Sequence, residues 1–437
     1  MKVYKALIGF CVAGALGSPP QAKAETVRLS LSDAILMARQ NNSLVKASRS
    51  RIEQAEARVV QSRQSYLPKV TLSETLMVTN DPGAALVFKL QQKSLVDSDF
   101  QAAKMTNPDA INDFNTSIQV MQPLYNADAA IGRRMASTAK RAEEQMAIRS
   151  EESIRLQVSK VYYGLLLAKK NIAALEQSIQ KMQHHSSEAS EGFRAGLLTK
   201  SDKLSTGVRL AELQEQKLIF QDEVKNALDA LHVLLHLDAG VTILPTSDLV
   251  VDKELPSEDE SRVAETRSDL KALETYRQVA VEQGEMARMA GRPRLNAFLQ
   301  SNLHSATVFN GGSSWALGLN MQWNIYDGNA TAGHIQEAKA REHEAMYNYE
   351  AAKSNAGVEV RKSLRSMHTA KARIAVARKS LEEATVSLDY ISSQFKTGMA
   401  MTFELLMREQ AYTYAKMRLN QATYDYCVAK SELEYSR

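Results

Sequence analysis

The sequence predicts a mostly α-helical chain with a small β part, in which long antiparallel coiled-coil hairpins are combined with four amphipathic strands. Three observations predict this fold class. The chain repeats one pattern twice, each copy holds a long helical seam, and each copy holds segments of period-2 alternation. Only 9 Pro and 19 Gly interrupt the 437 residues, which is too little punctuation for many short elements. We therefore expect few elements, most of them long.

The first 24 residues have the pattern of a secretory signal peptide. Lys2 and Lys5 precede an apolar run from Ala6 to Gly17, and the small-residue site Ala22-Lys23-Ala24 follows. A run of about 12 apolar residues is too short to cross a bilayer, so a cleaved leader is favoured over a membrane anchor. Its removal takes away three lysines and no acid, and the charge count falls from 54 minus 50 to 51 minus 50. This balance gives no argument for nucleic acid as a partner.

The mature chain would keep a single cysteine, Cys427, so no intramolecular disulfide is expected. It also has no run of 18 consecutive apolar residues, and no transmembrane helix is predicted. A secreted chain of this composition must therefore gain its stability from its long helices and from its partners.

The repeat is visible when the chain is compared with itself. The stretch FRAGLLTKSDKL, from Phe193 to Leu204, returns 202 residues later as FKTGMAMTFELL, from Phe395 to Leu406. The similarity extends over the rest of both copies. We predict a first structural repeat at 25–236, a proline-containing acidic linker at 237–261, and a second repeat at 262–437.

Each copy opens with a helix, roughly Leu31 to Tyr66 in the first copy, which a proline ends. Two strands follow, because apolar and polar residues alternate. In the second copy they contain Leu295 to Leu303 and Trp315 to Ile325, joined by a turn at Asn310-Gly311-Gly312-Ser313. The weaker counterparts in the first copy are Val70 to Val78 and Phe114 to Met121. Glu74 interrupts the apolar side of the former, and the stretch between the two is predicted to be a long loop with local helix.

A long helix follows the strands in each copy, with Asn126 and Asp327 as the predicted N-cap residues. Apolar and small residues recur at alternating spacings of three and four, which is typical of a coiled coil. About 70 residues give roughly 105 Å of helix. Gly196 and Gly398 are the predicted C-cap positions, after which the chain returns as a second helix. The seam of the first copy comprises Leu165, Ala168, Ile172, Leu175, Ile179, Met182, Ser186, Ala189 and Phe193, and that of the second copy comprises Met367, Ala370, Ile374, Ala377, Leu381, Ala384, Leu388, Ile391 and Phe395.

Such a chain needs neighbours. A hairpin near 100 Å long exposes too much surface for its volume, and four strands cannot close a barrel. Three chains would supply twelve strands, enough for a barrel with apolar residues toward lipid and polar residues toward a lumen, continued by a helical tube. In that arrangement Trp315 and Trp323 are candidate interfacial aromatics.

The chain resembles the TolC family of outer-membrane efflux and secretion channels over essentially its whole mature length. The matches are QPLYNAD and NIYDGN at the strand-to-helix junctions, RSDLKALE at the start of the second copy, and the paired tips FRAGLLTKSD and FKTGMAMTFE. The resemblance implies a homotrimer in the outer membrane of a Gram-negative bacterium, with a 12-stranded barrel in outer-membrane lipid and a tube in the periplasm. It also implies a periplasmic adaptor protein and an inner-membrane transporter, of the RND or ABC type, as partners.

The resemblance also implies roles for residues at the two tips. The family's adaptor-docking positions match Phe193, Gly196 and Leu197 in the first copy and Phe395, Gly398 and Met399 in the second. The acids that narrow the periplasmic aperture of the family match Asp202 and Glu404. Met407 stands where a second acid sometimes follows, which weakens the case for a paired acid ring. Acids in the first turn of a helix are also favoured by the helix dipole alone, and this second interpretation stays open.

Other classes of protein fit the sequence less well. A periplasmic adaptor would carry one hairpin beside compact β domains, and a filamentous coiled-coil protein would not carry alternating strands with Trp and Asn-Gly-Gly. We find no P-loop and no nucleophile elbow, so an enzyme is not expected. His184-His185 lacks a third ligand and is interpreted as solvated surface, and no cofactor or metal site is predicted. The cargo, small molecules or proteins, is left open.

Overall fold

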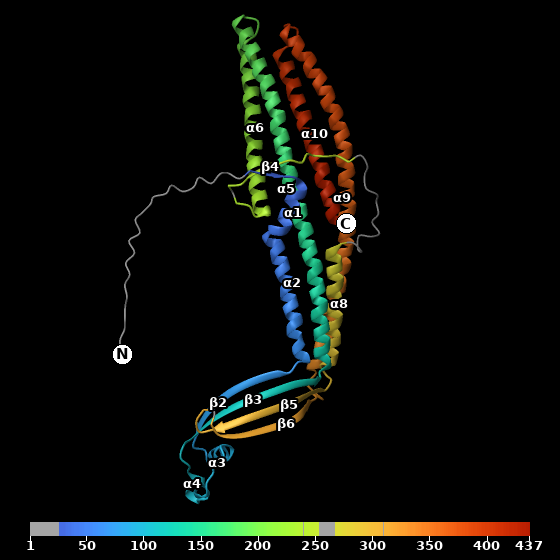
Figure 1. Cartoon of the computed structure of the whole chain (residues 1–437). Helices are drawn as coiled ribbons and strands as arrows, with labels where there is room; N and C mark the ends of the chain where they lie inside the picture. Colours follow the sequence, from blue (N-terminus) through green and yellow to red (C-terminus); the bar gives the residue numbers. More distant parts are fainter. Residues whose placement is uncertain (1–25, 239, 253–266, 309) are drawn as a thin grey trace, which may run out of the picture.

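The computed structural model describes residues 26–238, 240–252, 267–308 and 310–437. The chain is an elongated molecule with a four-stranded sheet at one end and two helical tips at the other (Figure 1). This confirms the predicted mostly helical fold class with its long hairpins. The expected leader at 1–24 lies outside the described residues, as does the linker from residue 253 to 261.

Two long hairpins form the helical part. The first joins α5 (Ala127–Arg194) to α6 (Lys200–Leu235), and the second joins α9 (Ala330–Lys396) to α10 (Thr402–Ser436). The 68 residues of α5 and the 67 residues of α9 each extend about 100 Å at 1.5 Å per residue. Six of the nine predicted seam residues of each copy are buried, so the apolar stripe is what holds each hairpin together. Phe193 is the one seam residue that is exposed.

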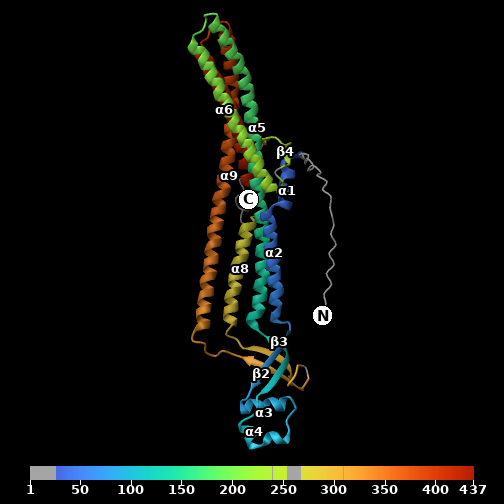
Figure 2. The same ribbon diagram turned by 90° about the vertical axis from the view of Figure 1, so that its left-hand side faces the viewer.

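Shorter helices complete the slab on the side of the sheet, where α2 (Ser43–Ser62) and α8 (Ser268–Met289) pack against α5 and α9. These helices continue α6 and α10 nearly end to end. The Nδ2 of Asn42 donates to the carbonyl oxygen of Leu234 at 2.9 Å, and the Nη1 of Arg267 lies 3.5 Å from that of Ser436. The helical part is therefore about four helices wide along its length (Figure 2).

The prediction of one unbroken helix from Leu31 to Tyr66 is wrong. The chain forms α1 (Leu31–Asn41) and then α2, and a short 3-10 turn (Arg63–Ser65) follows α2. The break lies at Asn42, which is buried and has an extended ψ of 131°. Its side-chain oxygen accepts from the N–H of Leu44 at 2.8 Å and so caps α2, while its amide group bonds the end of α6.

The sheet contains β2 (Lys69–Thr79), β3 (Ile111–Tyr125), β5 (Arg294–Ser305) and β6 (Gly312–Gln322) in this spatial order, and every neighbouring pair is antiparallel. Paired residues run from Lys69 through Met121 and Phe298 to Gly318. One face of the sheet is mostly apolar and exposed, as predicted. Its large exposed side chains are Val70, Leu72, Leu76, Ile118, Leu299, Trp315, Leu317, Leu319 and Met321.

The opposite face of the sheet carries polar side chains. Gln300 donates to the Oδ1 of Asn302 at 3.0 Å and lies 3.4 Å from the Oγ of Ser117. Phe298 is an exception on this face, and its ring fills the space above Gly318, where an added Cβ would meet Cζ of the ring at 2.8 Å. The sheet therefore separates a polar side from an apolar side, as a strand period of two requires.

An insertion between β2 and β3 forms the far end of the molecule. It contains α3 (Pro82–Gln91), a 3-10 turn (Asp97–Phe100) and α4 (Ala102–Thr106), as the prediction of local helix anticipated. The side-chain amide of Gln92 donates to Asp113 at 3.0 Å, and Asp113 lies 2.8 Å from the Nδ1 of His304 on β5. These contacts hold the insertion against the end of the sheet.

Two strands were missed by the sequence prediction of four strands per chain. β1 (Thr26–Leu29) pairs in parallel with β4 (Thr242–Pro245), which lies inside the predicted linker. The hydroxyl of Tyr162 on α5 donates to the carbonyl oxygen of Leu29 at 2.8 Å, and the N–H of Thr246 donates to it at 3.2 Å. The pair is thereby fastened to the middle of the helical part.

The start of α9 also differs from the prediction. Asn329, with φ of 70°, is the N-cap residue rather than Asp327. The carboxylate of Asp327 still accepts from the N–H of Thr331 at 2.9 Å, so it stabilises the first turn from outside the helix. Asn126 does precede α5 as predicted, but its amide donates to Asn296 at 3.3 Å instead of capping the helix.

Candidate functional site

The two tips, residues 193–204 and 395–406, have the same backbone geometry. Gly196 has φ of 73° and Gly398 has φ of 74°, which places both in the left-handed region that favours glycine. In the first tip, the N–H of Leu197 donates to Gly192 at 2.8 Å, and in the second, that of Met399 donates to Gln394 at 2.9 Å. Both glycines therefore end their helices in the way the repeat predicted.

The two acids begin the returning helices. Asp202 is the third residue of α6, where its Oδ2 accepts from the N–H and the hydroxyl of Thr199 at 3.0 and 2.6 Å. The Thr199 hydroxyl and N–H lower the pKa of the Asp202 carboxyl below its usual value. Glu404 holds the same place in α10, where its Oε2 accepts from the N–H of Met401 at 3.2 Å. Both acids are thus capping residues, and a role at an aperture stays a prediction.

The remaining tip residues present an apolar surface. Leu197 is 82% exposed and Met399 is 73% exposed, although both belong to well-ordered turns. Phe193 is half-exposed under the Nζ of Lys203, which lies 5.6 Å from the centre of its ring. Phe395, by contrast, is buried. The structure therefore places five of the six predicted docking residues at the surface of the tips, with Phe395 beneath them.

His184 and His185, interpreted above as solvated surface, differ from each other. His184 is exposed, but His185 is buried, and its Nδ1 lies 3.0 Å from Glu188. Its ring meets Phe395 edge to face at 6.3 Å between centroids. The interpretation of both as surface residues is therefore wrong for His185, which packs between α5 and α9 behind the tips.

A buried polar network was missed by the sequence reasoning. Glu409 on α10 is 0% exposed, and its Oε2 accepts from the Nε and Nη2 of Arg209 on α6 at 3.2 and 3.3 Å. Its Oε1 accepts from Thr413 at 2.8 Å, and Thr413 shares a bond of 2.7 Å with Ser178 on α5. One signal was available, because Glu409 follows the seam residue Leu405 by four positions and so shares its buried face. The network joins the two hairpins close to their tips.

The two tryptophans lie at opposite ends of the apolar face of the sheet. Trp315 is on β6 and is among the most exposed side chains of the sheet. Trp323 follows β6, which ends at Gln322, so the prediction that the strand continues through it to Ile325 is wrong. Its Nε1 donates to the carbonyl oxygen of Gly291 at 3.2 Å, which fixes the indole beside the helical part. Their proposed place at lipid interfaces stays a prediction.

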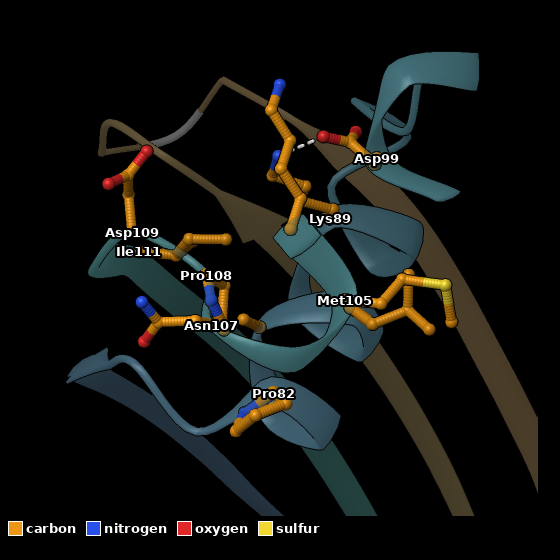
Figure 3. A pocket seen from close by; sticks show the side chains of 11 residues that line it. Pro82, Lys89, Asp99, Met105, Asn107, Pro108, Asp109 and Ile111 are labelled. Carbon is orange, nitrogen blue, oxygen red and sulfur yellow. Dashed lines mark hydrogen bonds and ion pairs between the residues drawn. The ribbon is translucent and has the colours of Figure 1, made fainter. Parts of the chain in front are cut away.

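The insertion beyond the sheet contains a small cavity of ≈ 110 Å³ (Figure 3). Lys89 on α3 pairs with Asp99 at 2.5 Å along one side, and apolar side chains such as Met105 and Ile111 line the rest. The ion pair links α3 to the following 3-10 turn. No sequence signal predicted this cavity, because it forms between three short segments.

Two searches bear on other classes of site. Across the part of the chain that the structure describes, no group of three or more His, Cys, Asp or Glu side chains is placed to hold a metal ion.

No helix among the described residues is long and apolar enough to span a bilayer.

Comparison with known proteins defines the class. The profile of the outer membrane efflux protein family matches residues 34–235 and 261–435, so the chain belongs to this family. It is an outer-membrane channel of a tripartite export system, and it acts in the outer membrane of a Gram-negative bacterium. A relative among characterised proteins is the alkaline protease secretion protein AprF of Pseudomonas aeruginosa. It is 22% identical over 331 residues, which cover 73% of this chain and 68% of AprF.

Solved structures show the same fold. A membrane protein from Pseudomonas aeruginosa superimposes with a TM-score of 0.81 at 18% identity, over 93% of each chain. The CmeC outer membrane channel of Campylobacter jejuni superimposes with a TM-score of 0.80 at 18% identity, over 93% of this chain and 85% of CmeC. The resemblance stated from the tip and junction motifs is thereby confirmed.

Proposed function

We propose that three copies of the chain form one duct, which passively carries cargo delivered by a periplasmic adaptor and an inner-membrane transporter. The sheets of the three copies would form the pore through the outer membrane lipid, and the helical hairpins would form the tube below it. The duct itself would carry out no catalysis, and the transporter, of the RND or ABC type, would supply the energy. A homotrimer agrees with the large exposed surfaces of a single chain.

The observation that carries the adaptor proposal is the exposed apolar surface of the tips. Leu197 and Met399 project from turns whose backbone is fixed by hydrogen bonds, and Met401 and Phe403 are exposed beside them. Apolar side chains that are held outward on ordered turns are typical of a docking surface. The glycines Gly196 and Gly398 leave the backbone open, because nothing lies within 4 Å of an added Cβ at either one.

A site-specific photo-cross-linker tests this docking surface in the intact cell envelope. We expect a cross-linker at Leu197 or at Met399 to capture a periplasmic protein with a long helical hairpin, identified by mass spectrometry. Val250 is the control position, because it is equally apolar and exposed but lies far from the tips. Equal capture from Val250, or no adduct from either tip, would contradict docking at the tips.

We also propose that Asp202 and Glu404 line the narrow periplasmic end of the duct. Their place at the start of α6 and α10, directly behind the tips, supports this. Planar-bilayer conductance of the wild type beside Asp202→Ala/Glu404→Ala tests it. We expect a small, cation-preferring conductance that rises or loses its preference in the double variant, because charge at a narrow mouth acts strongly on passing ions. A conductance with unchanged preference would leave both acids as capping residues only.

A further inference from the structure

The sheet has two unpaired edges of equal length. β2 and β6 each contain 11 residues, they lie at opposite ends of the strand order, and they run antiparallel to each other. Among the described residues no strand pairs with the outer edge of either one. Three strand spacings, about 14 Å, separate the two edges across the sheet, so one chain does not pair its own edges. Unpaired edges of this length require a partner strand.

The helical part has two matching edges. The packing order is α6 against α5, α5 against α10, and α10 against α9, so α6 and α9 lie on opposite sides of the slab (Figure 1). On α9 the exposed residues Tyr347, Val358, Val376 and Tyr390 fall on one stripe at 100° per residue, opposite the buried face of that helix.

A corresponding stripe lies on α6. Val208, Ile219 and Val233 are exposed and fall within about 40° of one another at 100° per residue, opposite the buried Leu213 and Leu231. A helix that carries apolar residues on the face away from its own hairpin is prepared to contact a second helix. The two stripes lie on different sides of the molecule, so a contact between them joins one copy to the next in a ring.

The edges of the sheet and of the slab are continuous. β6 leads directly into α9, while β2 follows α2, which continues α6 end to end through the bond between Asn42 and Leu234. One side of the molecule is therefore β6 with α9, and the other is β2 with α2 and α6. Because these two sides differ, the contact is head-to-tail rather than two-fold.

We propose that the occupant of each edge is a second copy of this chain, and that β6 of one copy pairs with β2 of the next in a fixed register. In this register Lys69 lies opposite Gln322, Leu72 opposite Leu319, and Thr79 opposite Gly312 of the neighbouring copy. The inference rests on the proposed trimer and specifies how its subunits join. It pairs all 11 residues of both strands.

The two faces of the sheet allow only every second register. The apolar side of β2 contains Val70, Leu72 and Leu76, and that of β6 contains Leu317 and Leu319. Even positions of β2 must therefore meet odd positions of β6, because a shift by one residue would put leucines on the polar side. A shift by two residues keeps the faces matched but leaves strand ends unpaired.

The tilt of the strands favours the same register. The in-chain pairing leads from Lys69 to Gly318, and the proposed register places Gly318 opposite Ser73 of the next copy. The offset is thus 73 minus 69 residues per copy, and roughly 41 Å around three copies, against a girth of about 58 Å for twelve strands. This gives a tilt of about 35°, whereas registers shifted by two residues give about 19° or 47°. Barrels of this kind tilt by about 35–45°.

Disulfide trapping tests the register with the full-length trimer in its membrane. Leu72→Cys with Leu319→Cys should cross-link neighbouring copies at least tenfold more than Leu72→Cys with Leu317→Cys or with Met321→Cys. Directly opposite Cβ atoms lie about 5 Å apart, and diagonal ones lie too far apart for a disulfide. The wild type is the background control, because Cys427 is buried and burial raises the pKa of its thiol to about 11.

The outcomes separate this inference from the proposed trimer. A ladder of covalent dimers and trimers only from the Leu72 and Leu319 pair supports the register. Stronger bonding from either displaced pair overturns the register, while a native mass of three chains would still support the trimer. Protein that stays folded and monomeric by native mass overturns the proposed trimer, and the register with it.

Discussion

The buried pair between Arg209 and Glu409 gives a prediction whose size follows from its geometry. The Glu409 carboxylate is fully buried and accepts two bonds from Arg209 and one from Thr413. Arg209→Met leaves this charge with the Thr413 hydroxyl as its remaining bonded partner. Breaking one partner of a buried ion pair costs about 3–5 kcal/mol, because the other charge stays buried without compensation.

The two partners should not be equivalent. Glu409→Leu leaves Arg209 with Glu212, which is half-exposed and lies 3.0 Å from its Nη1, so this change should cost less than Arg209→Met. The double variant Arg209→Met/Glu409→Leu replaces both charges by apolar groups of similar size. Its stability should lie close to that of the wild type or above it.

Hydrogen exchange of the backbone amides in the first turns of α6 and α10 measures this effect. A cost of about 3 kcal/mol corresponds to local opening, and hence exchange, that is more than 100-fold faster. Arg408→Met, at an exposed position beside Glu409, is the control and should leave exchange unchanged. The reasoning is refuted if Arg209→Met exchanges like the wild type, or if the two single effects simply add in the double variant.

Four further expectations follow. Thr199→Val should raise the pKa of Asp202 toward its usual value; because the lowered pKa belongs to the folded state, its contribution is lost as pH falls, and any cation preference of the conductance should fade at a higher pH than in the wild type. Cys427 should resist alkylation at pH 8 until the protein is denatured, as a maleimide time course would show, and rapid labelling of native protein would contradict its burial. Gly196→Ala should destabilise the tip by about 1–2 kcal/mol and Gly196→Asn by less, measured by exchange of the turn amides, since only the backbone angle opposes a side chain there. Asn42→Ala should cost about 1–2 kcal/mol through loss of the α2 cap, seen as faster exchange at the start of α2 but not of α8.

Local pattern was enough to predict the long hairpins and their turns. The seam residues recur with the period of a helix, and glycine is the residue that best tolerates the left-handed backbone that ends α5 and α9. The strands were predicted for the same reason, since Leu317, Leu319 and Met321 alternate with polar or small residues. These features depend on neighbours along the chain, which the sequence displays directly.

The features that were missed depend on partners far away in sequence. Asn42 breaks a helix because its amide group bonds Leu234, 192 residues later, and the local pattern around it continues the helix. His185 is buried because Phe395 covers it from another helix. The bounds of the two predicted repeats and the roles of Asp202 and Glu404 remain predictions.

The pairing of β1 with β4 has a consequence for how the chain is made. Residues 26 to 29 are among the first to leave the cell's secretion machinery, yet Thr26 pairs with Thr242, which follows 216 residues later. Until then the strand has no partner, and the pocket for the Tyr162 hydroxyl is incomplete. Contacts so distant in sequence form late and slowly. The closure of this strand pair therefore marks the time at which the first hairpin has been delivered entire, and before it the nascent chain carries an open edge to which other chains can add.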